Sequence, residues 1–160
     1  EDIPATEEEI DELMDVFTSY YGTHNQIKTK PYSGIPEVIR TLRKKGIRCA
    51  VASNKDDEHV QSLSKNLFPG LFDISIGRNP EMAIKPDPEM ILSIARRLRI
   101  KVKEIVYIGD SEVDIMTGKK GGFPSISVAW GFRTGEFLKN HGAERIAFSP
   151  DELIEMILSL

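Results

Sequence analysis

The stretch EIVYIGDSEVDI, residues 104–115, opens with apolar residues and then places two aspartates four positions apart. The apolar run is typical of a buried strand that ends at Gly109, and Asp110 follows it directly. Asp114 comes one helical turn later, on the same face as Asp110 if a helix begins here. Two carboxylates this close repel each other unless a positive charge holds them together. The spacing therefore predicts a strand, then a helix, with a cation where they meet.

The rest of the chain alternates between similar apolar runs and helical patterns. Further strands are predicted at residues 47–53 (IRCAVAS), 72–77 (FDISIG), 125–130 (SISVAW) and 145–149 (RIAFS). Helices are predicted from Ile35 to Gly46 and over residues 57–67, 88–98, 113–120, 135–140 and 150–160. Continuous Val/Ile-rich strands separated by helices indicate an α/β protein: a Rossmann-like parallel sheet with helices on both faces. Such sheets bind ligands at the carboxyl ends of their strands.

The amino-terminal part has a different pattern. Thr6 and Glu9 form a capping-box pattern before apolar residues that recur at helical spacing up to Tyr21, and Gly22 is placed to stop this helix. A polar stretch over residues 23–33 resembles a linker or hinge. We therefore predict two parts, residues 1–30 and residues 31–160.

Composition narrows the functional classes. A chain of 160 residues, with 40% hydrophobic and 29% charged residues, fits one soluble domain with a real core. The net charge of −4 argues against a nucleic-acid partner. No apolar run is long enough to cross a membrane, and no signal segment opens the chain. Cys49 is the single cysteine and is predicted to be a small buried side chain, which fits a reducing cytoplasm.

Polar residues follow three of the predicted strands. Ser53 and Asn54 come after IRCAVA, Lys85 lies in AIKPDP after FDISIG, and Asp110 and Asp114 follow EIVYIG. A hydroxyl and a lysine suit the oxygens of a phosphate ester, and carboxylates suit Mg²⁺, which takes hard oxygen ligands. Because the strand ends meet at one edge, these residues predict a site for Mg²⁺ and a small phosphate ester. Asp110 is the expected main metal ligand, with Asp114 orienting it or pairing with Lys85.

Each residue also has a structural alternative. Ser53 is explained equally by a turn or a helix cap, Lys85 by a solvated loop, Asp110 by a cap and Asp114 by an exposed helical acid. The combination at three strand ends favours the site.

Other residues that could carry chemistry have weaker patterns. The three histidines, His24, His59 and His141, show no mutual metal-ligand spacing and are predicted to be surface or loop residues. Trp130 and Phe132 are expected to pack at the sheet edge, with framing of a substrate entrance as the alternative.

The segments VASNK, AIKPDP and YIGDSEVDI, in this order, resemble motifs two, three and four of the haloacid dehalogenase (HAD) superfamily. Residues 30–55 and SISVAWGF are similar to its phosphoglycolate phosphatase branch. The resemblance implies that Ser53 binds the transferring phosphoryl group with Asn54 beside it. It also implies that Lys85 stabilises the charge shared by nucleophile and phosphate, and that Asp110 holds Mg²⁺ with support from Asp114. Lys85→Ala is then expected to reduce turnover strongly with little loss of stability.

The chain departs from the family pattern at the first motif. In the family, the first strand ends in an Asp-x-Asp-x-Thr motif, in which the first aspartate is the nucleophile and the second is the general acid and base. No Asp-x-Asp occurs in these 160 residues. The resemblance implies that this strand lies between the strands carrying Ser53 and Asp110. We therefore expect a core without its first strand, and a remnant of the family's helical cap from Thr6 to Tyr21. The place of this missing strand is then occupied by an upstream segment, occupied by another chain, or closed because the two flanking strands move together.

Two functions remain open. The first is a Mg²⁺-dependent phosphatase that hydrolyses a small, phosphoglycolate-like phosphomonoester through an aspartyl-phosphate. In this hypothesis the segment with the nucleophile is not among these 160 residues. The alternative is a non-catalytic protein that keeps the phosphate and metal site. A receiver-like signalling domain is a weaker third possibility, because VASNK offers a serine where a receiver needs an aspartate.

The first hypothesis predicts that residues 1–160 alone are catalytically inactive, because no carboxylate is available to attack phosphorus. The measurement is hydrolysis of p-nitrophenyl phosphate with Mg²⁺ by the purified 160-residue chain. Robust metal-dependent turnover would contradict the prediction, because it requires a nucleophile other than the family's first-motif aspartate.

Overall fold

A computed structural model describes residues 6–10, 12, 13, 16, 20 and 29–160. The chain divides into two compact units, Glu1–Pro31 and Tyr32–Leu160. In the first unit, residues 7–10, 12, 13, 16 and 20 are helical, and residues 29–31 have no regular secondary structure. The predicted capping box is confirmed: the Thr6 amide donates to Glu9 Oε2 (2.8 Å), and the Glu9 amide donates to Thr6 Oγ1 (3.3 Å). The other residues of this predicted helix, and Gly22, lie outside the described residues.

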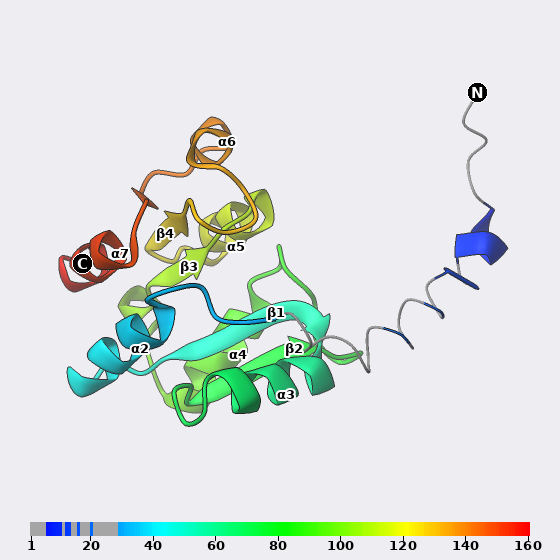
Figure 1. The fold of residues 1–160 in the computed structure, drawn as a ribbon, viewed down its shortest axis with the longest axis horizontal. Coiled ribbons are helices and arrows are strands. Elements are labelled where there is room, and N and C mark those ends of the chain that lie inside the picture. The colour runs from blue at the N-terminus through cyan, green and yellow to red at the C-terminus, as the bar shows by residue number, and fades with distance from the viewer. Residues whose placement is uncertain (1–5, 11, 14–15, 17–19, 21–28) are drawn as a thin grey trace. The chain divides into compact units, whose positions relative to one another are not determined.

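The second unit alternates strands and helices (Figure 1). Its strands are β1 (Ala50–Asp56), β2 (Ile74–Arg78), β3 (Tyr107–Gly109), β4 (Ser125–Val128) and β5 (Ile146–Ala147). Its helices are α2 (Ile35–Lys44), α3 (Asp57–Leu67), α4 (Glu89–Leu98), the short 3₁₀ helix η1 (Val102–Glu104), α5 (Glu112–Gly121), α6 (Gly135–Asn140) and α7 (Pro150–Leu158). The predicted α/β class and its alternation of elements are confirmed.

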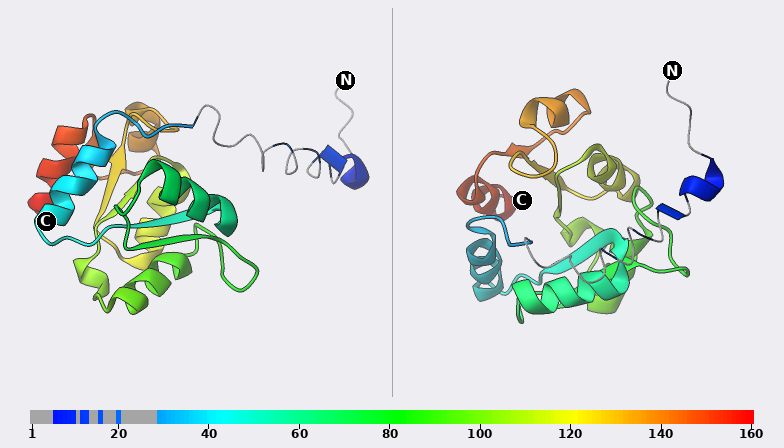
Figure 2. Two further views of the ribbon diagram at one scale, coloured as in Figure 1. Left: turned by 60° about the horizontal axis from the view of Figure 1, so that its bottom comes forward. Right: turned by 45° about the vertical axis from the view of Figure 1, so that its right-hand side comes forward.

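The strands form two parallel sheets. One has the order β1-β2 and the other β3-β4-β5. All three recorded strand pairs are parallel. Helices α3 and α4 cover opposite faces of the β1-β2 sheet (Figure 2), as expected when one connection leads on to β2 and the next turns back to β3. The carboxyl ends of β1 and β3 are therefore the edge to inspect for a site.

Two apolar clusters hold the helices on the strands. One cluster joins α2 and α7 to β4 and β5, with Leu42, Ile126 and Leu153 among its buried residues. The other joins α4 to β2 through Met90 and Ile76, and residues next to it belong to both β1 and β3. Helix α4 therefore packs against both sheets and keeps them at a defined spacing.

A wide apolar cavity separates β1 from β3. Within residues 29–160, which the structure describes without a gap, β1 pairs only with β2, and β3 pairs only with β4. The cavity has a volume of about 730 Å³. Its lining comes from both strands and from helices packed on them, and includes Val38, Ala52, Ile94, Ile108, Val128 and Ile157. Among the described residues the two strands have not closed up, so each presents an unpaired backbone edge.

The bounds of all five strands differ from the predicted ones by one to three residues at one or both ends. Ser53, expected at the end of the first strand, lies inside β1 together with Asn54 and Lys55, and the pairing register with β2 shifts between Ala52 and Asp56. The predicted strand over residues 104–109 is shorter, since Glu104 belongs to η1 and β3 begins at Tyr107. Cys49 is partly buried, and burial raises the pKa of its thiol. Among the described residues, no helix is long and apolar enough to cross a membrane.

The cavity predicts different costs for two isoleucine truncations on neighbouring strands. Ile126→Ala on β4, where the side chain is 1% exposed, should lower the free energy of unfolding by about 2–5 kcal/mol. Ile108→Ala on β3 should cost clearly less, because that side chain is 38% exposed and already borders the cavity. Urea unfolding of the two variants measures both values. Equal costs would mean that the space beside β3 is filled in solution.

Candidate active site

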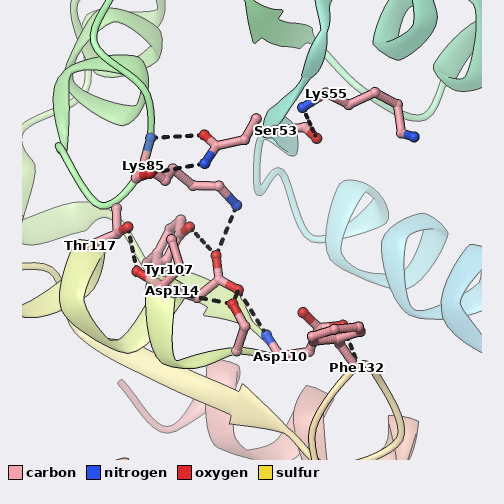
Figure 3. Close-up of polar contacts among 11 residues, drawn as sticks. Ser53, Lys55, Lys85, Tyr107, Asp110, Asp114, Thr117 and Phe132 are labelled. Atoms are coloured by element: carbon pink, nitrogen blue, oxygen red, sulfur yellow. Dashed lines mark hydrogen bonds and ion pairs between the residues drawn. The ribbon is translucent and has the colours of Figure 1, made fainter. Parts of the chain in front are cut away.

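The predicted site residues lie at the carboxyl ends of β1 and β3 and in the loop after β2 (Figure 3). Ser53 lies in the irregular end of β1, where its hydroxyl accepts a hydrogen bond from the Lys55 amide (3.2 Å). This bond leaves the hydroxyl proton available for an acceptor such as a phosphate oxygen.

Asn54 fixes the main chain of the loop that carries Lys85. Its Nδ2 donates to the Lys85 carbonyl (2.9 Å), and its Oδ1 accepts from the Lys85 amide (2.8 Å). These two bonds use both ends of the side-chain amide. Asn54 therefore joins the end of β1 to the loop after β2, and its side chain acts first on the position of Lys85.

Lys85 and Asp114 form a partly buried ion pair. Lys85 Nζ lies 2.9 Å from Asp114 Oδ1, and the two side chains are 15% and 9% exposed. Burial alone would raise the pKa of the Asp114 carboxyl, but the Lys85 charge and hydrogen bonds from Ser111, Lys85 and Tyr107 outweigh it and hold the pKa below 3.8. The pair of Lys85 with Asp114 was one of the two roles expected for this aspartate.

Asp114 accepts hydrogen bonds from four groups. Oδ1 accepts from Lys85 Nζ and the Tyr107 hydroxyl (2.8 Å), and Oδ2 accepts from the Ser111 hydroxyl (2.6 Å) and the Asp110 amide (3.2 Å). Burial and the nearby Asp114 charge raise the pKa of Tyr107, so its hydroxyl stays protonated and donates. Both carboxylate oxygens are thus occupied, which suits a residue that orients its neighbours.

Gly109 makes this arrangement possible. A Cβ atom at this position would lie 2.1 Å from Asp114 Cβ and 2.8 Å from Asp114 Oδ2. Any other residue at the end of β3 would push the Asp114 carboxylate away from the Asp110 amide. The glycine before Asp110 therefore allows helix α5 to pack close to the strand end.

Asp110 has a carboxylate that a metal ion could use. Its Oδ2 accepts the Phe132 amide (2.9 Å), and this bond does not involve Oδ1. One carboxylate at the end of a strand fits Mg²⁺, because this ion usually binds one or two carboxylates together with water and phosphate oxygens. Among the described residues, no group of three or more His, Cys, Asp or Glu is arranged to hold a metal. Ligation of Mg²⁺ by Asp110 or Asp114 stays a prediction.

The sequence patterns did not indicate several residues that organise this site. Tyr107 had been assigned only to a strand, although a buried tyrosine hydroxyl usually needs a partner. Arg133 makes a two-bond contact with Glu112 at 2.9 and 2.7 Å, and this contact lowers the pKa of Glu112 to about 2. No periodicity links residues 21 positions apart, so this pair required the tertiary structure.

The two aromatic residues after β4 behave differently from each other. Trp130 is partly buried and packs against the cluster of α2, α7, β4 and β5, as expected. Phe132 is 73% exposed, so the expectation that it packs at the sheet edge is wrong. The Phe132 amide donates to Asp110 Oδ2, and the centre of the exposed Phe132 ring lies 4.6 Å from Arg133 Cζ.

The three histidines have separate surroundings, and His141 lies beside Phe137, the ring that Arg133 contacts. His141 follows α6, where its ring stacks on Phe137 with centroids 3.8 Å apart and Nδ1 lies 2.8 Å from the Phe137 carbonyl. His59 lies in α3, and His24 is outside the described residues.

Parallel strands with polar side chains at their carboxyl ends define an α/β protein built to bind a charged ligand at that edge. A profile of haloacid dehalogenase-like hydrolases matches residues 2–128, so the chain belongs to this family. The phosphoglycolate phosphatase of Escherichia coli (strain K12) is 31% identical over 155 residues, which cover 96% of this chain and 61% of the relative. The Salmonella typhi phosphoglycolate phosphatase is 31% identical over 139 residues, 86% of this chain and 55% of the relative.

Solved structures agree with this membership. A protein assigned as a phosphoglycolate phosphatase from Lactobacillus delbrueckii subsp. bulgaricus superposes with a TM-score of 0.94 and 42% identity, over 98% of this chain and 66% of that one. A predicted phosphatase from Clostridium acetobutylicum gives 0.85 and 30%, over 98% and 73%. The resemblance to the HAD superfamily and its phosphoglycolate phosphatase branch is confirmed. The chain spans 55% to 61% of the curated relatives named above.

The ion pair changes the expectation that loss of Lys85 would leave stability intact. Lys85→Ala and Asp114→Asn each leave one partly buried charge without its partner, and each should lower the free energy of unfolding by about 3–5 kcal/mol at neutral pH. Because the native pKa of Asp114 lies below 3.8, its stabilisation is complete above that pH and is lost as the pH falls through the native pKa.

Urea unfolding at pH 7 and at an acidic pH below the ordinary carboxyl pKa tests this prediction. The difference between wild type and Asp114→Asn should shrink as the pH falls through the native pKa of the Asp114 carboxyl, which lies below its ordinary value. The control is Glu155→Gln, which removes an exposed acid from α7 and should change little at pH 7. A difference between wild type and Asp114→Asn that is equally large at both pH values would mean that the carboxylate charge does not stabilise the fold.

Proposed function

We propose that this chain is the phosphate- and metal-binding part of a Mg²⁺-dependent phosphatase that hydrolyses a small phosphomonoester such as phosphoglycolate. The observation that carries the proposal is a continuous set of contacts at one edge of the fold: Asn54 holds the Lys85 backbone, Lys85 pairs with Asp114, and Asp114 accepts the Asp110 amide. Family membership and the phosphoglycolate phosphatase relatives support the reaction class.

Each residue would have a separate role toward the phosphoryl group. The Ser53 hydroxyl would donate to a phosphate oxygen, and Lys85 would offset the charge shared by that group and the attacking carboxylate. Asp110 would hold Mg²⁺, which when bound neutralises phosphate charge and orients it. Asp114 would keep Lys85 and Asp110 in place. Asn54, whose amide contacts the Lys85 main chain, would position this lysine.

The attacking carboxylate would come from a strand between β1 and β3. The apolar cavity of about 730 Å³ and the two unpaired strand edges suit one further parallel strand. Its carboxyl end would carry the family's nucleophilic aspartate to the edge where Lys85 lies. Attack on phosphorus would form an aspartyl-phosphate and break the bond to the alcohol, whose oxygen takes a proton from the family's acid–base aspartate. Water would then give a proton to that aspartate and attack the aspartyl-phosphate at phosphorus, which releases inorganic phosphate and restores the carboxylate.

The remaining assignments belong to the same proposal. Residues 1–30 would be the end of a helical cap and its linker, joined to the α/β core at residues 31–160. The substrate would be a small phosphate ester and not nucleic acid, because a net charge of −4 disfavours a polyanion. A single cysteine suits the reducing cytoplasm.

A graft tests the function. The segment of the Lactobacillus delbrueckii relative that precedes its match to this chain is fused in front of residue 1. We expect Mg²⁺-dependent hydrolysis of p-nitrophenyl phosphate and of phosphoglycolate. The matched control is the same fusion in which the aspartate of the grafted segment that aligns with the family's nucleophile is changed to Asn, and this fusion should be inactive. A folded fusion that binds phosphate and Mg²⁺ without turnover would favour the non-catalytic alternative.

A further inference from the structure

Arg133 is held from several sides. Its guanidinium makes two hydrogen bonds to Glu112, at the start of α5 (2.9 and 2.7 Å). Its Cζ lies 4.6 Å from the centre of the Phe132 ring and 4.5 Å from that of Phe137 in α6. We call Glu112, Phe137 and residues 131–133 the Arg133 clip. The clip ties the loop after β4 to both α5 and α6.

Within residues 29–160, the hydrogen bonds from this clip to Asp110 come from backbone amides. The Phe132 amide donates to Asp110 Oδ2 (2.9 Å), and the Arg133 amide donates to the Asp110 carbonyl (3.2 Å). Gly131 makes the close approach possible, because a Cβ atom there would lie 2.2 Å from Asp110 Oδ2. The loop therefore presses against one side of this carboxylate, and any displacement of the loop moves a hydrogen bond to it.

We infer that Arg133 is a positioning residue for the Asp110 carboxylate: it holds the Phe132 amide on Oδ2 and so aims Oδ1 at the metal position. The inference rests on the proposed function, in which Asp110 binds Mg²⁺. An aspartate carboxylate rotates easily about its last bond, and a donor fixed on one oxygen sets the direction of the other. Groups that orient a metal ligand in this way typically change metal affinity by about 10- to 100-fold.

Exposure of the clip argues against a role in stability alone. The Arg133 and Glu112 side chains are 34% and 31% exposed, and most ion pairs this accessible contribute little to folding, although a two-bond guanidinium–carboxylate pair such as this one is among the stronger of them. A planar guanidinium can nevertheless stack between two rings and bind both carboxylate oxygens, which fixes the loop in one orientation. A lysine at this position would keep the charge but lose the second bond and the stacking.

The test uses Arg133→Ala and Arg133→Lys in the 160-residue chain. NMR measures hydrogen exchange of the Phe132 amide without metal, and a Mg²⁺ titration followed by the amides of residues 109–111 measures the dissociation constant. The matched control is Arg43→Ala. Arg43 pairs with Asp73 at 2.6 Å with side chains 33% and 24% exposed, and this pair makes no recorded contact with Asp110.

Arg133→Ala should speed exchange of the Phe132 amide and raise the Mg²⁺ dissociation constant, each by about tenfold, and Arg133→Lys should fall between it and wild type. Arg43→Ala should change neither. Unchanged values in Arg133→Ala, or an equal rise in Arg43→Ala, would overturn the inference. If wild type binds no Mg²⁺, the proposed function fails, and the exchange of Phe132 decides the inference: unchanged exchange in Arg133→Ala overturns it.

Discussion

The ion pair between Lys85 and Asp114 is the contact on which both the site and its surroundings depend. Between β1 and β3 the described residues make no strand pairing, so side chains join the two sheets at their carboxyl ends. Lys85 belongs to the loop after β2, and Asp114 belongs to the helix after β3. Each buried charge needs the other, because a lone charge in this environment costs several kcal/mol. The same contact therefore stabilises the edge and aligns the residues that would bind phosphate.

Hydrogen bonds extend this contact in both directions. Asn54 ties Lys85 to β1, and the Asp110 amide ties Asp114 to the end of β3. The loop after β4 adds a bond from Phe132 to Asp110. These contacts link the proposed phosphate- and metal-binding residues to one another, whereas the facing edges of β1 and β3 have no strand partner among the described residues. The cavity between β1 and β3 is lined mostly by apolar side chains, with the charged residues Arg48, Lys103 and Glu104 before the amino ends of the two strands, and this lining suits a strand with apolar residues.

The sequence predicted well those features that depend on neighbours along the chain. Apolar runs set the strands and helical spacing set the helices, because each pattern records which face of a short segment is buried. The position of Asp110 followed from the same logic, since a polar residue after a buried strand must lie at the sheet edge. Two expectations failed for the opposite reason. Ser53 lies within β1, where a register shift interrupts pairing, and Phe132 is exposed in a loop whose Phe132 and Arg133 amides donate to Asp110.

By itself the sequence determined the α/β class, the order of the elements and the position of Asp110 directly after β3. The family resemblance also indicated the slot between the strands carrying Ser53 and Asp110. Tertiary structure alone decided which polar groups meet. Asn54 and Lys85 are 31 positions apart, Lys85 and Asp114 are 29 apart, and Arg133 and Glu112 are 21 apart. No local periodicity relates such distant residues. Their partners are chosen by the paths of loops across the sheet edge, and only packing of the whole unit sets those paths.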